Sequence, residues 1–197
     1  MIKAILFDLG GTYMRGSSII FVQKACKVLE IPFSRFSVDN MVFDSAYNKG
    51  EITIQEFFHR YFSVPISGPQ MKQLIGLWTT SWKPEPEMIG LVNRLKKKYR
   101  LGMLSNSDPV NFPNYAKKGW IRPFEVLVLS HELGMLKPEK EIYLHAIRKT
   151  GFDAKEILFI DDQKPCLKTA EELGMKTILF RSLKQLKKDL AKLGIDC

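Results

Sequence analysis

Residues 2–12 of the chain read Ile-Lys-Ala-Ile-Leu-Phe-Asp-Leu-Gly-Gly-Thr. A short apolar run that ends on an acid and continues into glycines predicts a buried strand that delivers the carboxylate of Asp8 into a loop. The strand would hold that carboxylate in place, and the glycines would leave bare backbone beside it for a ligand. Asp8 is therefore our first candidate for a catalytic nucleophile.

Four more short apolar runs follow, and stretches with helical periodicity separate them. This alternation predicts an α/β, Rossmann-like fold: a parallel five-stranded sheet with helices on both faces. The predicted strands are 2–7, 101–104, 126–129, 157–160 and 177–180, and the predicted helices are 87–98, 139–150, 165–173 and one that begins at Leu183 and carries a leucine stripe to Leu193.

Residues 15–83 differ because they contain no apolar strand run. Thr53 and Glu56 have the spacing of a capping box at the start of a helix. An insert directly after the first strand lies over the C-terminal end of that strand, where Asp8 emerges. We therefore expect an α/β core domain formed by residues 1–14 and 84–197 and an inserted α-helical cap domain formed by residues 15–83, with helices at 20–29, 36–47, 54–62 and 71–81.

Composition limits the function classes that remain open. The chain has 197 residues, of which 45% are hydrophobic, so it can bury a core. No apolar stretch is long enough to cross a membrane, and Lys3 and Asp8 interrupt the first apolar run, so we expect neither a membrane segment nor a signal peptide. Three cysteines without metal-ligand spacing favour a reducing, cytoplasmic location and argue against a disulfide framework or a zinc site.

The net charge of +9 raises the question of nucleic-acid binding. Lysines at 96–98 close a predicted helix, where cations favour the dipole, and those at 184–192 fall mostly outside the apolar stripe of the last helix. No RNA- or DNA-binding signature accompanies them. We expect no nucleic-acid partner.

Polar residues follow the predicted strands at the points where they end. Ser105 and Asn106 follow the second strand, Lys137 follows the third at a helix entrance, and Asp161 and Asp162 end the fourth. Because the carboxyl ends of parallel strands meet at one edge of the sheet, we expect these groups to converge on the first carboxylate.

Phosphoryl transfer could use each of these groups. A carboxylate can attack phosphorus and form an acyl phosphate. Neighbouring carboxylates need a cation, and hard oxygen ligands select Mg²⁺. An ammonium and hydrogen-bond donors would neutralise and hold the equatorial oxygens.

The segments 7–12, 104–106, 137–138 and 160–162 resemble, in order, the four motifs of the haloacid dehalogenase-like hydrolase superfamily. The resemblance covers the whole chain, because the helical insert lies where that superfamily has its cap of the first type. Residues 50–53 and 129–143 resemble the branch that holds the α-glucose-1-phosphate phosphatases and the phosphatase domain of epoxide hydrolases.

The resemblance implies a Mg²⁺-dependent phosphatase that acts on a small phosphorylated metabolite, with a sugar phosphate as one candidate, through an aspartyl-phosphate intermediate. It would work as a monomer or homodimer. The implied catalytic residues are Asp8 and Lys137, the implied substrate-binding residues are Ser105, Asn106, Gly11 and Thr12, and the implied metal ligands are Asp8, the carbonyl of Gly10 and Asp162, with Asp161 holding a metal-bound water.

One departure from the family pattern concerns Gly10. Most phosphatases of the superfamily have a second aspartate there, which protonates the leaving oxygen and later activates water. Glycine can offer a carbonyl to a metal but cannot transfer a proton, and such a group typically contributes ~10²–10⁴-fold. We therefore expect a preference for acidic leaving groups, as in anomeric sugar phosphates, acyl phosphates or aryl phosphates.

Three other functions fit part of the pattern. The glycine loop also opens actin-like sugar kinases, but these need two such domains. A 2-haloacid dehalogenase lacks the second acid as well but works without metal, which would leave Asp161 and Asp162 unbalanced. A catalytically degenerate member that binds a phosphorylated ligand is supported by Gly10.

Further residues have weaker signals. Arg15, at the first hinge, is a candidate for a second anion contact because Arg favours bidentate oxyanion contacts. Asp108 could replace the missing acid. His131 is expected at the surface or in a hydrogen bond, and Trp78 and Trp82, at helical spacing, are expected to pack.

Overall fold

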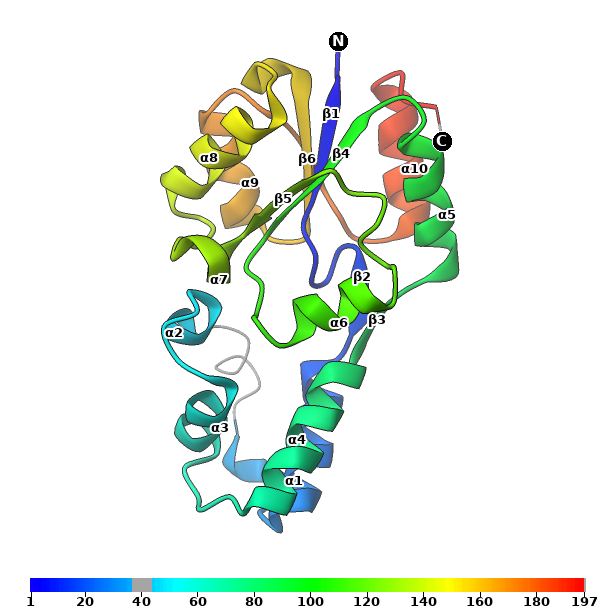
Figure 1. Ribbon diagram of the computed structural model, residues 1–197. Helices are drawn as coiled ribbons and strands as arrows, with labels where there is room; N and C mark the ends of the chain where they lie inside the picture. The colour runs from blue at the N-terminus through cyan, green and yellow to red at the C-terminus, as the bar shows by residue number, and fades with distance from the viewer. Residues whose placement is uncertain (37–43, 197) are drawn as a thin grey trace.

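The structure, a computed structural model, describes residues 1–36 and 44–196 and is built on one five-stranded parallel sheet (Figure 1). The order across the sheet is β5-β4-β1-β6-β7, and every pairing is parallel. The predicted fold class is therefore confirmed, and each strand begins and ends within two residues of its prediction. The strands are β1 (Ala4–Phe7), β4 (Arg100–Ser105), β5 (Val126–Leu129), β6 (Ile157–Asp161) and β7 (Lys176–Leu179).

The first strand is the centre of the sheet. β1 pairs with β4 on one side and with β6 on the other, and its four residues are completely buried. A strand covered on both faces can be apolar at every position, which explains the unbroken apolar run in the sequence. This central place brings the residue after β1, Asp8, between the ends of β4 and β6.

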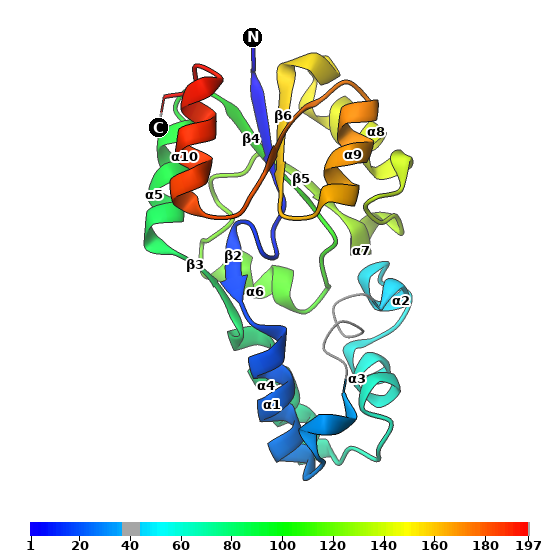
Figure 2. The same cartoon turned by 180° about the vertical axis from the view of Figure 1, so that it is seen from behind.

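Helices cover both faces of the sheet (Figures 1 and 2). α5 (Pro86–Leu95) and α10 (Leu183–Lys192) pack on one face, and α8 (Lys140–Thr150) and α9 (Lys164–Glu172) pack on the other. Each face therefore has its own apolar cluster.

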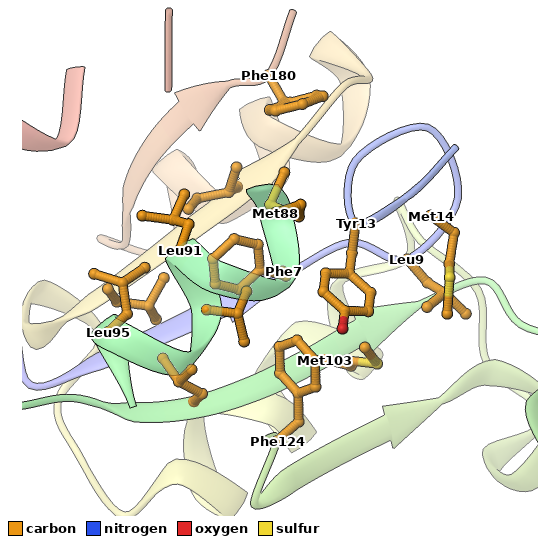
Figure 3. Packing of buried hydrophobic residues seen from close by; sticks show 14 of the residues in the cluster. Phe7, Leu9, Tyr13, Met14, Met88, Leu91, Leu95, Met103, Phe124 and Phe180 are labelled. Carbon is orange, nitrogen blue, oxygen red and sulfur yellow. The ribbon is translucent and has the colours of Figure 1, made fainter. Parts of the chain in front are cut away.

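The cluster under α5 shows how this packing is built. Leu91 and Leu95 of α5 belong to one cluster with Phe7 of β1 and Met103 of β4 (Figure 3), and all four are fully buried. The leucine stripe of α10 is confirmed at its centre. Leu193 is an exception: it is 42% exposed, because the helix ends at Lys192 and Leu193 caps it.

The helices of the insert lie together beyond the C-terminal ends of the strands (Figure 1). They bury a third apolar cluster, separate from the two in contact with the sheet. We call them the cap helices: α1 (Ser18–Leu29), α2 (Ser45–Asn48), α3 (Ile54–Phe62) and α4 (Gly68–Thr80), with the short 3-10 helix η1 (Phe33–Arg35) after α1. The capping box of Thr53 and Glu56 is present at the start of α3.

A two-stranded antiparallel ribbon joins the cap helices to the sheet. β2 (Met14–Gly16) leads in and β3 (Trp82–Pro84) leads out, with Met14 opposite Pro84 and Gly16 opposite Trp82. The expected boundaries at 14/15 and 83/84 fall inside this ribbon. Trp82 is therefore in a strand rather than on the helix of Trp78, although the two rings do pack, with centroids 4.7 Å apart.

Within the described residues, four short helices were not predicted, and one predicted helix is only partly described. The unpredicted helices are too short to show a periodicity: η1, α6 (Asn111–Lys117), α7 (Ser130–Leu133) and the 3-10 helix η3 (Ala154–Glu156). The predicted helix 36–47 falls largely on residues 37–43, outside the described part of the chain. Phe36 itself has extended backbone (φ −112°, ψ 130°), so no helix begins there.

Within the described ranges, no helix combines the length and apolarity required to span a bilayer.

The close packing of the sheet gives a stability prediction at Gly102. A Cβ there would lie 2.6 Å from Leu6 Cδ2 and 2.8 Å from the backbone oxygen of Val126. Gly102→Ala should therefore destabilise the fold by ~1–3 kcal/mol. Gly76→Ala is the matched control, because a Cβ at this helical position meets nothing within 4 Å, and it should stabilise by up to ~1 kcal/mol. Urea denaturation of both variants is the measurement; equal stability of the two would contradict the described packing.

Candidate active site

A cavity of about 290 Å³ lies at the carboxyl ends of the strands, below the sheet and against the cap helices. Four of the predicted site residues line its polar end: Asp8, Asn106, Lys137 and Asp162. Gly10 and Gly11 form part of its wall. The convergence expected from the strand order is thus present in the structure.

Lys137 links the ends of two strands through a buried ion-pair network. Its Nζ lies 2.6 Å from Asp8 Oδ1 and 2.6 Å from Asp161 Oδ2. The side chain of Lys137 is 4% exposed and that of Asp161 is fully buried. Breaking one side of a buried pair typically costs ~3–5 kcal/mol, so this lysine is part of the fold as well as of the site.

Burial and like charges shift the pKa values of these groups. Burial is the largest effect on Asp8 and raises its pKa; Lys137 opposes this, the Asp161 charge adds to it, and the pKa of Asp8 reaches about 7. Burial alone lowers the pKa of Lys137, but the two carboxylates outweigh it and the net direction is upward. Burial and Asp161 also raise the pKa of Asp162. One ammonium does not neutralise three neighbouring carboxylates.

The residues of this acidic cluster fit a magnesium ion. Asp8, Asp161 and Asp162 each offer a carboxylate oxygen, and these oxygens all lie within 4.8 Å of one another. Such hard oxygen donors are the ligands that Mg²⁺ takes in proteins. The oxygens of Asp161 already accept from Lys137 and, at 2.7 Å, from the backbone N–H of Gln163, whereas Asp162 is exposed to the cavity. Asp162 is thus better placed than Asp161 for direct ligation.

The two glycines of the loop have different surroundings. Gly11 has φ +80°, and a Cβ there would lie 2.3 Å from Asp162 Oδ2, so only glycine lets the carboxylate come this close to the loop. Gly10 has open space, because a Cβ there would meet nothing within 4 Å. The missing aspartate at position 10 is therefore not excluded by packing.

The side chain of Asn106, although it lines the cavity, forms its hydrogen bonds with the protein backbone. Its Oδ1 accepts from the Lys137 backbone N–H at 2.8 Å, and its Nδ2 donates to the Lys137 carbonyl at 2.9 Å. This paired contact fixes the backbone that carries the lysine. Substrate binding by Asn106 stays a prediction. The structure adds that Asn106 positions the backbone of Lys137.

Ser105 and Thr12 have buried hydroxyl oxygens with no hydrogen-bond partner among the described residues. Neither residue lines the cavity wall, although Ser105 ends β4, the strand next to β1. An unmade hydrogen bond at a buried group costs ~1–3 kcal/mol. A ligand oxygen at the strand ends would remove this cost.

Arg15 is not among the residues that line the cavity, and its contact with a second anion stays a prediction. Its Nη1 donates to the Gly11 carbonyl at 3.1 Å, and its Nε lies 3.5 Å from Glu85. The side chain is 46% exposed. Its positive charge acts to lower the pKa of Asp162, so the guanidinium lies near the acidic cluster without lining the cavity.

Asp108 lines the cavity but is fully used as an acceptor. Its Oδ1 accepts from the backbone N–H groups of Val110 and Asn111 at 3.0 and 2.7 Å and from the Tyr47 hydroxyl at 3.0 Å. Its Oδ2 accepts from Asn111 Nδ2 at 3.0 Å. These four contacts use Asp108 as an acceptor and hold its side chain in place; its role as a replacement acid stays a prediction.

The cap contacts at α2 were not predicted. Besides the Tyr47–Asp108 bond, Ser130 Oγ donates to the Asn48 carbonyl at 2.6 Å, and Lys49 pairs with Glu139 at 2.9 Å. A backbone carbonyl as acceptor leaves no sequence signal. These contacts fasten α2 over the cavity.

The expectation for His131 is met by a hydrogen bond: its Nδ1 lies 2.7 Å from Ser107 Oγ, and burial lowers its pKa.

Comparison with known proteins agrees with the fold. Residues 2–174 match the haloacid dehalogenase-like hydrolase family, and the chain belongs to that family of hydrolases. The predicted resemblance is thereby confirmed.

Several relatives span nearly the whole chain. A sesquiterpene phosphatase of Aspergillus oryzae is 24% identical over 88% of this chain and 87% of its own length. The D-ribitol-5-phosphate phosphatase of Bacteroides thetaiotaomicron is 27% identical over 90% of this chain and 91% of its own. A solved family enzyme of that bacterium, in complex with magnesium and inorganic phosphate, is 27% identical with a TM-score of 0.74 over 94% of this chain and 99% of its own.

The glycine loop generates a testable difference. Gly11→Ala should destabilise the fold by ~1–2 kcal/mol through the strained φ, and should weaken Mg²⁺ binding at least about tenfold by displacing Asp162. Gly10→Ala is the matched control and should bind Mg²⁺ as the unmodified protein does. Isothermal titration with Mg²⁺ measures both, and equal Mg²⁺ affinity in the two variants would contradict the assignment of Asp162.

Proposed function

We propose that the protein is a Mg²⁺-dependent phosphatase that hydrolyses a small phosphorylated metabolite through an aspartyl-phosphate intermediate. The observation that carries this proposal is the single cluster of Asp8, Lys137, Asp161 and Asp162 at the cavity end. The two relatives described above that span most of the chain are both named as phosphatases, which supports the proposal.

Asp8 would act as the nucleophile. Lys137 holds Oδ1, which orients the side chain and leaves Oδ2 to attack phosphorus. The new Asp8–phosphorus bond forms as the bond to the leaving oxygen breaks, and water then cleaves the acyl phosphate and regenerates the carboxylate. A bound Mg²⁺ would neutralise phosphate and carboxylate charge.

Lys137 would neutralise the transferring phosphoryl group together with the metal, because its ammonium is fixed beside the nucleophile. The hydroxyl of Ser105 and the loop of Gly11 and Thr12 would hold the phosphate oxygens. The metal ligands would be Asp8, the Gly10 carbonyl and Asp162, with Asp161 in support through a water.

The insert would act as a cap domain over a core formed by residues 1–14 and 84–197. Its α2 helix is bonded to the core at Asp108 and Ser130, beside the cavity. A cap in this position excludes water from the reacting groups.

The nucleophile can be tested directly. Asp8→Asn should lower Mg²⁺-dependent phosphate release on the order of 10⁴-fold, because an amide cannot form the acyl phosphate. Chelation of Mg²⁺ should have a comparable effect on the unmodified enzyme. The control is Asp196→Asn, whose carboxylate is 88% exposed.

Two results would overturn the proposal. Hydrolysis of a 2-haloacid that resists the chelator would favour a dehalogenase. Absence of turnover across a broad phosphate panel, with ligand binding retained, would favour a degenerate protein that binds a phosphorylated ligand.

The absent acid can be restored at Gly10, where a side chain has room. Gly10→Asp should raise kcat/KM toward an alkyl phosphate such as glycerol phosphate at least about tenfold, because the new carboxyl can protonate the leaving oxygen. The gain toward 4-nitrophenyl phosphate, whose leaving group needs no proton, should be smaller. Gly10→Asn has the same shape without the proton, and an equal gain in both variants would refute the explanation.

A further inference from the structure

The cavity continues from the acidic cluster into a space walled by aromatic rings. The rings come from the cap helices, from the ribbon and from α6, so they enclose the space from more than one side. They belong to Tyr47, Phe57, Trp78, Trp82, Phe112 and Tyr115.

The cap side of this wall is held by ring-to-ring contacts. Tyr47 and Phe57 stack with centroids 4.7 Å apart and planes 5° apart. Phe57 packs against Trp78 at 5.7 Å, and Trp78 packs edge-on against Trp82 at 4.7 Å. Such contacts contribute ~0.5–1.5 kcal/mol each beyond area burial and keep the rings in place. The wall is therefore preformed.

Many polar groups of the cavity have their hydrogen bonds inside the protein. Asp108 accepts four, the amide of Asn106 is bound to the Lys137 backbone, and Ser107 is bonded to His131. Two lining side chains keep an unbonded buried polar atom, the donor Trp78 Nε1 and the acceptor Asn111 Oδ1. A sugar with more hydroxyl groups than these would bury the others at ~1–3 kcal/mol for each unmade bond. The space therefore suits a weakly polar group better than a sugar.

The charges of the cavity favour a monophosphate. Among the described residues that line it, Lys137 alone is cationic, and it is already paired with Asp8 and Asp161. A second phosphate or carboxylate on the substrate would meet no partner. The volume of about 290 Å³ is at the small end of ligand sites, which suits a single ring system.

We propose that the substrate class is the aryl phosphomonoesters, with the substrate ring bound between the aromatic walls. This inference rests on the proposed phosphatase activity and narrows it. It joins two independent observations: the ring-lined space, and the absence of a proton donor at Gly10, which an aryloxide leaving group tolerates because phenols are far more acidic than alcohols.

The test measures binding of phosphonates, which carry the same groups but are not hydrolysed. Titration calorimetry with Mg²⁺ present compares phenylphosphonate with cyclohexylphosphonate and 2,3-dihydroxypropylphosphonate. We expect phenylphosphonate to bind at least about tenfold more tightly than the diol and severalfold more tightly than the cyclohexyl compound. Equal affinity of the phenyl and cyclohexyl compounds, or tighter binding of the diol, overturns the proposal.

Variants locate the ring. Trp82→Leu in the ribbon and Phe112→Leu in α6 should each reduce the phenyl-to-diol preference severalfold. Phe152→Leu is the matched control, since Phe152 packs beside the sheet outside the cavity, and should keep the preference. If one ring variant fails to fold, the other and the unmodified protein still decide the question. A preference unchanged in the folded ring variants contradicts the assigned walls.

The two proposals fail separately. A phenyl preference in binding without hydrolysis of any phosphate would remove the phosphatase proposal and with it the substrate class. Mg²⁺-dependent hydrolysis without a phenyl preference would remove the aryl assignment alone.

Discussion

The buried contact of Lys137 with Asp8 and Asp161 is the constraint on which the site depends. It joins the ends of β1 and β6 to the loop before α8, three segments far apart in the chain. A buried ammonium is tolerated only with such partners, and the carboxylates are tolerated only with a cation. Fold and proposed chemistry therefore need the same three side chains.

Two neighbouring segments hold the residues of this contact in place. Asn106, just after β4, binds both polar backbone groups of Lys137, and Gly11 leaves the space into which Asp162 fits. Asn106, at the end of a neighbouring strand, therefore positions the lysine, and the loop after β1 positions Asp162 of the acidic cluster. Pre-set groups of this kind need little reorganisation during phosphoryl transfer.

Much of the sheet could be predicted because β1 and its neighbours are apolar along their whole length, and their polar ends follow a fixed order. The convergence of Asp8, Lys137 and Asp162 could be predicted for the same reason. Short helices such as α6 could not, because one or two turns show no periodicity. The bonds of Asp108 and the place of Arg15 depend on tertiary contacts, and the cap aromatics read as ordinary core residues until their position beside the cavity was known.

The β2–β3 ribbon has a consequence for how the molecule can change. The two strands that connect the cap helices to the sheet, β2 and β3, are hydrogen-bonded to each other, and the cap helices bury an apolar cluster of their own. Residues of that cluster can be exchanged, and the ligand space reshaped, while the ion-pair network at the sheet edge stays untouched. In the proposed function, the part of the ring wall that comes from the cap can therefore diverge without changing the reacting groups, while the rings of α6 remain tied to the core.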